Sequence, residues 1–294
     1  MALGKGQYQA NIFPEFDRIY PSVPVIEGQR SGTVASFSGE ISTGNWGGET
    51  GFVVIQAQIE GEAFTGSATG DVVGTIEMEK VVRLSPTLGK ESPVGGIVLF
   101  DGKNLDEWEH WGRNQGKPAQ WKLVDDAMEI VPGSGSIVSR KKFTDFELHL
   151  EFRTPFLSAV KGQGRGNSGV YLQGRYEVQV LDSYGLEGRD NECGGIYKVG
   201  APLVNMCAPP LQWQTYDMTF YAPRFDDDGN KTENARLTVL HNGVKIHNDI
   251  EIPELTGAAW DRVDDNISQP GGISLQDHGN PVQYRNIWVL ELPE

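Results

Sequence analysis

Hydrophobic and polar residues alternate in short stretches along the chain. In residues 147–153 the leucine and phenylalanine side chains face one way and the charged side chains face the other, because successive residues of a strand point to opposite faces. Residues 176–181, 272–278 and 282–289 follow the same two-residue period. We find no stretch of eleven or more residues with a clear helical period. The pattern predicts an all-β protein, with a two-sheet antiparallel sandwich in its larger part.

A smaller β-module is predicted in front of this sandwich. Four alternating runs, at residues 7–13, 33–41, 51–59 and 71–82, are separated by glycine-containing turns. Residues 84–96 contain two prolines and three glycines without periodicity, which is typical of a linker. We therefore expect a module over residues 1–83, a linker over 84–96 and the sandwich over 97–294. The length of 294 residues suits two unequal domains, since single cores stop growing at roughly 250–300 residues.

The net charge and the short length of the apolar runs argue against nucleic acids and membranes as binding partners. The formal net charge is −15, so phosphate backbones and anionic lipid surfaces are repelled and nucleic acid is an unexpected partner. The longest apolar runs, residues 52–55 and 97–100, are far shorter than the roughly 18 residues of a membrane span. The first 16 residues have no apolar core typical of a signal peptide. We expect no membrane span and no signal peptide in this chain.

Cys193 and Cys207 are the only cysteines. Two cysteines exclude a four-thiolate zinc site and a disulfide-dense scaffold. A disulfide that closes this loop would stabilise the fold by about 3 kcal/mol in the chain-entropy model. The sequence leaves a disulfide and a pair of buried thiols as equal alternatives.

Two motifs suggest a ligand only weakly. Residues 164–169 match the glycine pattern of a dinucleotide loop, but the residues that follow alternate like strands instead of forming the required helix. We expect a plain loop, or a bend that brings Asn167 and Ser168 towards a ligand. Residues 226–230 carry three aspartates that suit calcium but lack EF-hand spacing, and a solvated hairpin loop has the same composition. The same two alternatives apply to the cluster of Asp261, Asp264, Asp265 and Asn266.

Charged side chains on the polar strand faces are the stronger candidates for chemistry. The alternation in residues 282–289 puts Tyr284 and Trp288 on one face and Gln283 and Arg285 on the other. If the strands share one curved sheet, these faces form a groove; otherwise they are solvated faces with cross-strand salt bridges. The groove would gather Glu147, Glu151, Glu177, Arg153, Arg285 and His278. The aromatic residues are expected in the core or as platforms for sugar rings: Trp108, Trp111, Trp121, Tyr171, Tyr197 and Trp213.

An ordered set of short motifs, from about residue 97 to residue 292, resembles the 3-keto-disaccharide hydrolase family. The set comprises residues 99–105 (LFDGKNL) with Trp108, residues 146–147 and 152–153, 167–171 (NSGVY), 176–182 (YEVQVLD), Trp213-Gln214, 275–279 (LQDHG) and 285–287 (RNI). Each motif is weak alone, whereas their order is specific. The resemblance implies a concanavalin A-like, laminin-G-like jelly roll whose concave face holds the sugar.

The resemblance also implies an activity and a setting. The family cleaves glycosides whose glucose unit carries a ketone at C3, and many relatives are exported by bacteria. It therefore implies a carbohydrate substrate, a periplasmic or extracellular location and an upstream sugar 3-oxidoreductase that supplies the substrate. Residues 1–83 resemble a module that precedes this domain in some relatives and begin abruptly, so we expect the module to be incomplete at its N-terminus and to act as a structural or docking element.

A ketone at C3 makes the proton on C2 acidic, so hydrolysis can proceed by elimination of the C1 substituent and addition of water. Such a site needs a base, an acid for the departing oxygen and a stabiliser of the enolate. We expect Glu177 as the base, His278 as the acid and Arg153 as a charge stabiliser, a role that Arg285 can share. The expected sugar contacts are Asn167, Tyr171, Gln179, Asp182, Tyr197, Gln276 and Arg285.

Three alternatives stay open at the sequence level. A divalent metal could replace the arginines, since Glu177, Asp182, Asp277 and His278 have suitable ligand atoms; no cofactor is otherwise expected. The sandwich could be a lectin-like module without activity, because fold does not determine function. It could also be a two-carboxylate glycosidase on unoxidised sugars, with Glu177 and either Glu151 or Asp182 as the pair.

Overall fold

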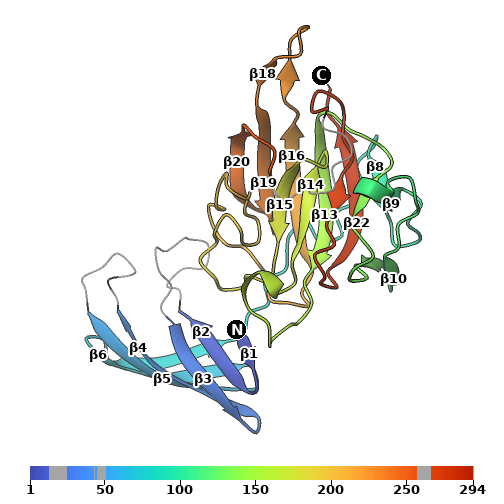
Figure 1. Ribbon diagram of the computed structural model, residues 1–294. Coiled ribbons are helices and arrows are strands. Elements are labelled where there is room, and N and C mark those ends of the chain that lie inside the picture. The colour runs from blue at the N-terminus through green and yellow to red at the C-terminus, as the bar shows by residue number, and fades with distance from the viewer. Residues whose placement is uncertain (13–24, 43, 45–50, 257–265, 294) are drawn as a thin grey trace. The chain divides into compact units, whose positions relative to one another are not determined.

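The computed structural model describes residues 1–12, 25–42, 44, 51–256 and 266–293 (Figure 1). These residues form antiparallel strands and short 3₁₀ turns such as η2 (Gly112–Asn114) and η3 (Gly162–Gly164), and they include no α-helix. The predicted all-β sandwich class is confirmed. The chain divides into a smaller unit, Met1–Arg83 with the segments Leu157–Lys161 and Tyr184–Glu187, and a larger unit made of the remaining residues.

The smaller unit is one antiparallel sheet in which each strand pairs with its neighbour along the chain. Its side chains alternate between a polar face and an apolar face, and the apolar face forms a cluster around Ile26, Phe37 and Ile55. A Cβ at Gly28 would overlap the Phe37 ring, so the sheet needs glycine there. The strands are β1 (Ala2–Gly4), β2 (Gln7–Asn11), β3 (Val25–Ser31), β4 (Val34–Ser42), β5 (Phe52–Glu60), β6 (Ala63–Gly70) and β7 (Gly74–Glu79).

Four of these strands match runs expected from the alternation. The runs at 33–41 and 51–59 correspond to β4 and β5, the run at 71–82 to the shorter β7, and the run at 7–13 to β2, although residue 13 lies outside the described residues. Strands β3 and β6 were not expected, because Gly28 and Gly66 interrupt their hydrophobic alternation.

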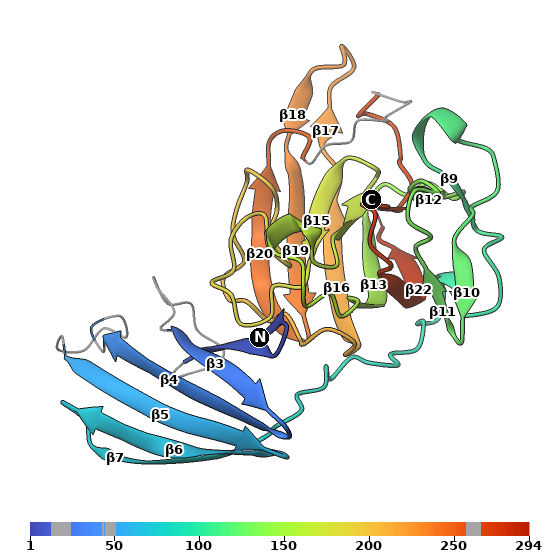
Figure 2. The same cartoon turned by 60° about the horizontal axis from the view of Figure 1, so that its bottom comes forward.

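The larger unit contains two antiparallel sheets (Figure 1; Figure 2). The eight-stranded sheet has the order β10-β11-β22-β13-β16-β19-β20, with β8 also paired to β22, and the five-stranded sheet has the order β15-β14-β21-β12-β9. The eight-stranded sheet comprises β8 (Ile97–Phe100), β10 (Lys122–Val124), β11 (Ala127–Glu129), β13 (Phe146–Arg153), β16 (Gln214–Tyr221), β19 (Ala235–His241), β20 (Val244–Ile252) and β22 (Gln283–Glu291). The five-stranded sheet comprises β9 (Trp108–His110), β12 (Ile137–Ser139), β14 (Ser168–Leu172), β15 (Tyr176–Val180) and β21 (Ser274–Leu275), and a separate hairpin pairs β17 (Arg224–Phe225) with β18 (Lys231–Glu233).

The core lies between the inner faces of the two sheets. Tyr176 of β15 packs on Phe220 of β16 with ring centroids 5.4 Å apart. Tyr284 of β22 donates a hydrogen bond to the Ser168 hydroxyl of β14 at 2.7 Å. Each large apolar side chain that is fully buried here stabilises the fold by about 1.5–3 kcal/mol. In each strand, every second side chain points away from the core. These side chains form the outer faces of the sandwich.

Residues 85–90, within the expected linker, pack on the outer face of the eight-stranded sheet. Thr87 donates to the Asp217 carboxylate at 2.7 Å, and the backbone N–H of Gly89 donates to Glu151 at 2.5 Å. The Lys90 carbonyl accepts hydrogen bonds from Asn286 and Trp288, each at 3.1 Å. We call residues 85–90 the strap. They are held in place because they form hydrogen bonds with polar groups of the sheet that would otherwise be buried without partners.

The expected alternation of β22 is wrong beyond Arg285. Asn286 adopts a positive φ of 45°, and the pairing registers of β22 with β13 and β8 shift near it. Such a bulge moves the following side chains to the opposite face. Trp288 therefore stacks on His149 of the outer face, with ring centroids 5.2 Å apart, instead of joining Tyr284 in the core.

The two cysteines are free, buried thiols. The Cys193 thiol lies 3.2 Å from the Tyr216 hydroxyl, and the Cys207 thiol lies 3.4 Å from the Leu181 carbonyl. Of the two alternatives left by the sequence, the structure has the thiol pair.

Candidate functional site

Glu177 lies on the outer face of β15, where loops cover it. Its side chain is only 7% exposed, and its backbone N–H donates to the Thr256 hydroxyl at 2.6 Å. Burial raises the pKa of Glu177 to about 7, against a smaller lowering by a hydrogen bond with Tyr171. A carboxylate loses hydration when it is buried, so it binds a proton more tightly. Glu177 can therefore exchange a proton near neutral pH.

Tyr171 holds this carboxylate from the neighbouring strand. It pairs with Glu177 across β14 and β15, so both side chains point to the same face. Gln276 donates a hydrogen bond from Nε2 to the Tyr171 hydroxyl at 3.1 Å, which leaves the hydroxyl proton for Glu177. Trp111 packs on the Tyr171 ring with centroids 4.9 Å apart. The hydroxyl that bonds Glu177 is thus fixed from two further directions.

Gly169 provides the space that Glu177 occupies. A Cβ built on Gly169 would overlap Oε1 of Glu177 and crowd the Tyr171 ring. Gln276, which follows β21, donates its backbone N–H to the Gly169 carbonyl at 3.0 Å. The glycine therefore brings strand β14, the carboxylate and the end of β21 together.

Hydrogen-bonded amide side chains lie on the side of η3, and one of them, Gln179, shares the outer face of β15 with Glu177. Gln163 accepts hydrogen bonds at its Oε1 from Asn167 at 3.0 Å and from Gln179 at 3.1 Å. Gln179 is 9% exposed, and its Oε1 atom is buried without a hydrogen-bond partner among the described residues. The hydroxyl of Ser274 in β21 is also buried without a hydrogen-bond partner among the described residues. Unpartnered buried polar atoms are rare, and such groups beside a buried acid are suited to a polar ligand.

The turn after β21 carries His278 near this cluster. The Asp277 carboxylate accepts backbone N–H groups of Gly133, Gly135 and Gly279, and Asn280 accepts the backbone N–H of Asn167 at 3.1 Å. His278 is exposed between Asp277 and Asn280. Of its neighbours in the turn, Asn280 is bonded to Asn167, whereas Asp277 is bonded to the backbone of residues 133, 135 and 279. Strand β21 is only two residues long, so the alternation expected over residues 272–278 does not extend to His278.

The expected arginines lie on the other sheet. The guanidinium groups of Arg153 in β13 and Arg285 in β22 both pack on the Trp213 ring, at 4.7 and 4.2 Å from its centroid. Arg285 also donates to Glu151 at 2.7 Å and to Asp126 at 2.8 Å. Arg153, Arg285 and Glu151 therefore share the outer face of the eight-stranded sheet, while Glu177 is on the outer face of the five-stranded sheet. The structure does not bring these groups into one groove.

Two further expected sugar contacts lie outside the Glu177 cluster or are already engaged. Asp182 is buried and accepts two hydrogen bonds from the buried Arg165, the longer at 3.0 Å. Tyr197 is 42% exposed, with the Lys198 ammonium 5.2 Å from its ring centroid. A second carboxylate for a two-carboxylate glycosidase is not at hand in the described part of the chain, since Asp182 and Glu151 are each bound to an arginine.

The other ligand motifs have structural roles where they are described. Asp226 accepts the backbone N–H groups of Asp228, Gly229 and Asn230, so residues 226–230 form the solvated hairpin turn between β17 and β18. The cluster at Asp261, Asp264 and Asp265 lies outside the described residues, although Asn266 is described. The glycine pattern at 164–169 leads into strand β14, as the alternation indicated. Among the described residues, no three side chains of histidine, cysteine, aspartate or glutamate gather as a metal site.

Sequence reasoning missed three members of the site. Gln163 lies in a loop without a recognisable pattern, so no signal in the sequence identified it. Ser274 shared its predicted face with Gln276 and His278, and the alternation could have included it. Gly169 was seen only as part of a glycine-rich bend, because its role depends on where Glu177 lies after pairing.

The chain matches a known family over most of the larger unit. The model of the 3-keto-alpha-glucoside-1,2-lyase-like domain matches residues 95–290. A 3-keto-disaccharide hydrolase of Bacteroides thetaiotaomicron is 26% identical over 241 residues, which cover 67% of this chain and 79% of that protein. A crystal structure from Parabacteroides distasonis, described as a candidate glycosyl hydrolase, is similar with 38% identity and a TM-score of 0.60, and the match covers 67% of this chain and 84% of that one.

The larger unit is thus a β-sandwich that carries a buried carboxyl group with a pKa of about 7, and the family match gives its class. The chain belongs to the 3-keto-alpha-glucoside-1,2-lyase-like family, which confirms the resemblance drawn from the motifs. Membership makes it a hydrolase that acts on glycosidic bonds. The described residues contain no helix that is long and apolar enough to cross a membrane.

Proposed function

We propose that the chain cleaves 3-keto-glycosides or 3-keto-disaccharides by elimination and hydration, with Glu177 as the base that starts the reaction. The observation that carries this proposal is the buried Glu177 carboxyl group, whose pKa of about 7 suits proton exchange with a weak carbon acid. The family and the Bacteroides relative support the substrate class.

The reaction balances with the residues at hand. Glu177 removes the proton on C2, and the electron pair moves to the C3 ketone oxygen as an enolate. When the enolate collapses, the C1–O bond breaks, and the departing oxygen takes a proton from an acid. Glu177 then exchanges its proton with solvent. Water adds to C1 of the resulting enone and gives its second proton to the deprotonated acid, while C2 regains a proton from Glu177. The net change is hydrolysis, and the base ends in its starting state.

We assign the acid to His278 and the sugar contacts to the amides and hydroxyls of the cluster. His278 is exposed, and the N–H groups of an imidazolium can donate a proton to a departing oxygen. The buried Gln179 oxygen and the Ser274 hydroxyl lack partners in the described structure, and sugar hydroxyls can satisfy both. Asn167 and Gln276 serve as further contacts, while Arg153 and Arg285 lie on the other sheet and have no assigned role in this scheme.

The setting of the reaction follows from the substrate. A ketone at C3 arises by oxidation of a sugar, so an oxidoreductase must supply the substrate. We also propose a periplasmic or extracellular location in a bacterium, on the strength of the family resemblance. Cell fractionation of the source organism with an antibody to the chain tests that location, and recovery in the cytosolic fraction would contradict it.

Matched 3-keto and unoxidised disaccharides, incubated with purified protein in D2O, test the proposed reaction. We expect cleavage of the oxidised sugar alone, with one deuteron incorporated at C2 of the 3-keto product, because elimination exchanges that hydrogen. Glu177→Gln should lower turnover by about 10²–10⁴-fold, the usual contribution of a general base. His278→Gln should lower it less for substrates with good leaving groups. Tyr221→Phe, at an exposed position, is the matched control.

Other outcomes identify the alternatives. Cleavage of the unoxidised sugar at a comparable rate without deuterium would indicate an ordinary glycosidase. Saturable binding without product would indicate a lectin-like module. Retention of normal turnover by Glu177→Gln and by His278→Gln would refute the assignment of the base and the acid.

A further inference from the structure

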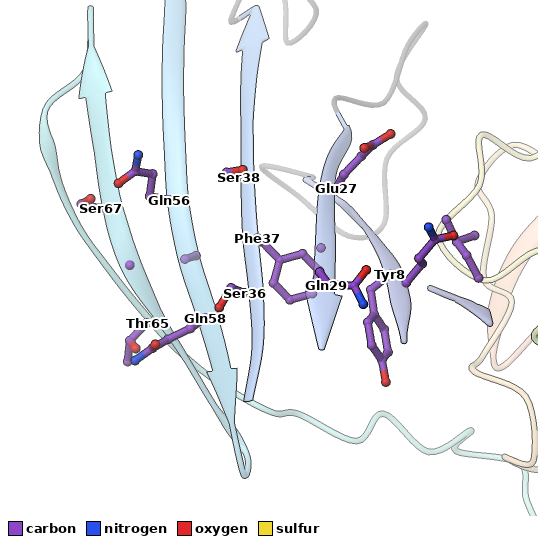
Figure 3. A pocket seen from close by; sticks show the side chains of 15 residues that line it. Tyr8, Glu27, Gln29, Ser36, Phe37, Ser38, Gln56, Gln58, Thr65 and Ser67 are labelled. Atoms are coloured by element: carbon purple, nitrogen blue, oxygen red, sulfur yellow. The ribbon is translucent and has the colours of Figure 1, made fainter. Parts of the chain in front are cut away.

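The smaller unit contains an open cavity of about 830 Å³ on its sheet (Figure 3). The cavity crosses strands β3, β4, β5 and β6 and reaches Tyr8 of β2 at one end. Its volume falls within the range of small-molecule sites. Nothing in the proposed reaction uses this part of the molecule.

Two rows of polar side chains line the cavity. Cross-strand pairing aligns Glu27, Ser38, Gln56 and Ser67 in one row, and Gln29, Ser36, Gln58 and Thr65 in the next row on the same face. Between the rows lie Gly28, Phe37, Ala57 and Gly66, whose side chains, where present, point to the apolar face. Because these side chains point to the other face, the backbone between the rows forms the floor, and the amides and hydroxyls form the walls.

These side chains are available to a ligand. Gln29, Gln56 and Gln58 are exposed, as are the serines and the threonine of the two rows. The hydrogen bonds found among the described residues include none from these amides and hydroxyls. An amide side chain both donates and accepts, and a hydroxyl does the same, so the two rows can bond adjacent hydroxyls of a sugar.

The charge and the backbone exclude other classes of ligand. Among the described residues that line the cavity, Glu27 is the only charged one, and none of them is a lysine or arginine. Acidic residues also outnumber basic residues in residues 1–83, so the face repels phosphate and sulfate groups. The backbone groups of the central strands already pair within the sheet, so a peptide cannot add as a further strand there. A neutral, hydroxyl-rich ligand satisfies each of these conditions.

We propose that the amide-lined cavity of the smaller unit is a non-catalytic binding site for a neutral carbohydrate chain. This site goes beyond the proposed function and does not depend on Glu177. It would give the protein a second means of attachment to glycans, and two linked binding sites raise the effective concentration of the second.

An array of neutral and sulfated glycans, probed with the full-length Glu177→Gln protein, tests the proposal. We expect binding to neutral glycans only, and calorimetry with a bound glycan should then give a measurable Kd. Gln56→Ala combined with Gln58→Ala should weaken that Kd about tenfold, because both variants remove hydrogen-bonding groups. Thr69→Ala combined with Thr75→Ala, on the same sheet but outside the cavity, is the matched control and should leave the Kd unchanged.

Turnover of a small 3-keto disaccharide separates this site from the active site. The double glutamine variant in an otherwise wild-type chain should keep normal turnover and normal thermal unfolding while it loses glycan binding. No binding to any neutral glycan, binding to sulfated glycans alone, or a Kd that is insensitive to the glutamine variants would each overturn the proposal. If the Glu177→Gln protein binds neutral glycans but the wild-type chain turns nothing over, the proposed reaction fails and this site stands.

Discussion

Glu177 and Glu151 are the same side chain in opposite surroundings. Burial raises the pKa of both, but only Glu151 has enough partners to reverse the effect. Hydrogen bonds from His149, Asn286, the Gly89 backbone and Arg285 lower the pKa of Glu151 to about 2. Glu177 has one lowering partner, Tyr171, and stays at about 7. At the scale of residues, the number of hydrogen bonds to the charged form decides which carboxylate can act as a base.

Tyr171→Phe should move the pH dependence of the reaction. The Tyr171 hydroxyl stabilises the charged form of Glu177, so its loss raises the pKa of Glu177 further. We expect the acidic limb of the kcat/KM profile to shift to higher pH by about one unit, the equivalent of one hydrogen bond to a charged group. Activity should fall more at pH 6 than at pH 8. Equal losses at both pH values would show that Tyr171 acts only through packing.

Glu177→Gln should change how stability depends on pH. The folded pKa of about 7 lies above the ordinary value of 4.5, so the folded state binds the proton more tightly. Stability from this proton is present below pH 4.5 and is lost as the pH rises through 7. Relative to the wild type, the variant should therefore gain about 2 kcal/mol in free energy of unfolding between pH 5 and pH 8. Urea unfolding at both pH values measures this, and a parallel loss in both proteins would contradict it.

At the scale of elements, the strap decides how the outer face of the eight-stranded sheet is closed. Three titratable groups lie below it, His149, Glu151 and Asp217, and Lys90 of the strap itself pairs with Asp217. Burial lowers the pKa of His149, but hydrogen bonds and charges from Asp217 and Glu151 outweigh it and the net shift is upward. Hydrogen bonds with His149 and Thr87 lower the pKa of Asp217 despite its burial. The positive charges of Arg285, Lys90 and protonated His149 thus compensate the buried negative charges of Glu151 and Asp217.

The raised pKa of His149 and the lowered pKa values of Glu151 and Asp217 together define the pH range in which the strap is held. Glu151 and Asp217 have lowered pKa values, so their stabilisation is present above their ordinary values and is lost as the pH falls towards the folded values. His149 has a raised pKa, so its stabilisation is present below 6.5 and is lost as the pH rises through its folded value. The strap is therefore most firmly held in mildly acidic solution.

Glu151→Gln should loosen the strap and destabilise the larger unit. The change removes the buried one of the two carboxylate partners of Arg285 and one acceptor of His149, and breaking a buried charge pair costs about 3 kcal/mol. Urea unfolding at pH 6 measures this loss, and hydrogen exchange at the Gly89 amide should quicken. Glu91→Gln, at an exposed position beside the strap, is the control. Unchanged exchange at Gly89 in the Glu151 variant would contradict the role of the strap.

At the scale of the whole molecule, the two units use β-sheets in different ways. The larger unit packs two sheets around a core and carries the Glu177 cluster on the outer face of one of them. The smaller unit is a single sheet with an apolar cluster on one face and the amide-lined cavity among the polar rows of the other. Since the net charge of −15 repels anions, both candidate sites suit neutral sugars better than phosphorylated ligands.

Alternation along the sequence determined which side chains of β13 and β15 point to the core, because a strand has a period of two whatever it pairs with. The ordered motifs likewise determined the family. Alternation does not show which sheet a strand joins. Arg153 and Glu177 were therefore predicted to line one groove, although they lie on different sheets. A bulge at Asn286 also reversed the side of Trp288, and residues 85–90 became a strap. Only tertiary pairing fixed these points, since they depend on contacts between residues that are far apart in the sequence, such as Gly89 with Glu151 and His149 with Trp288.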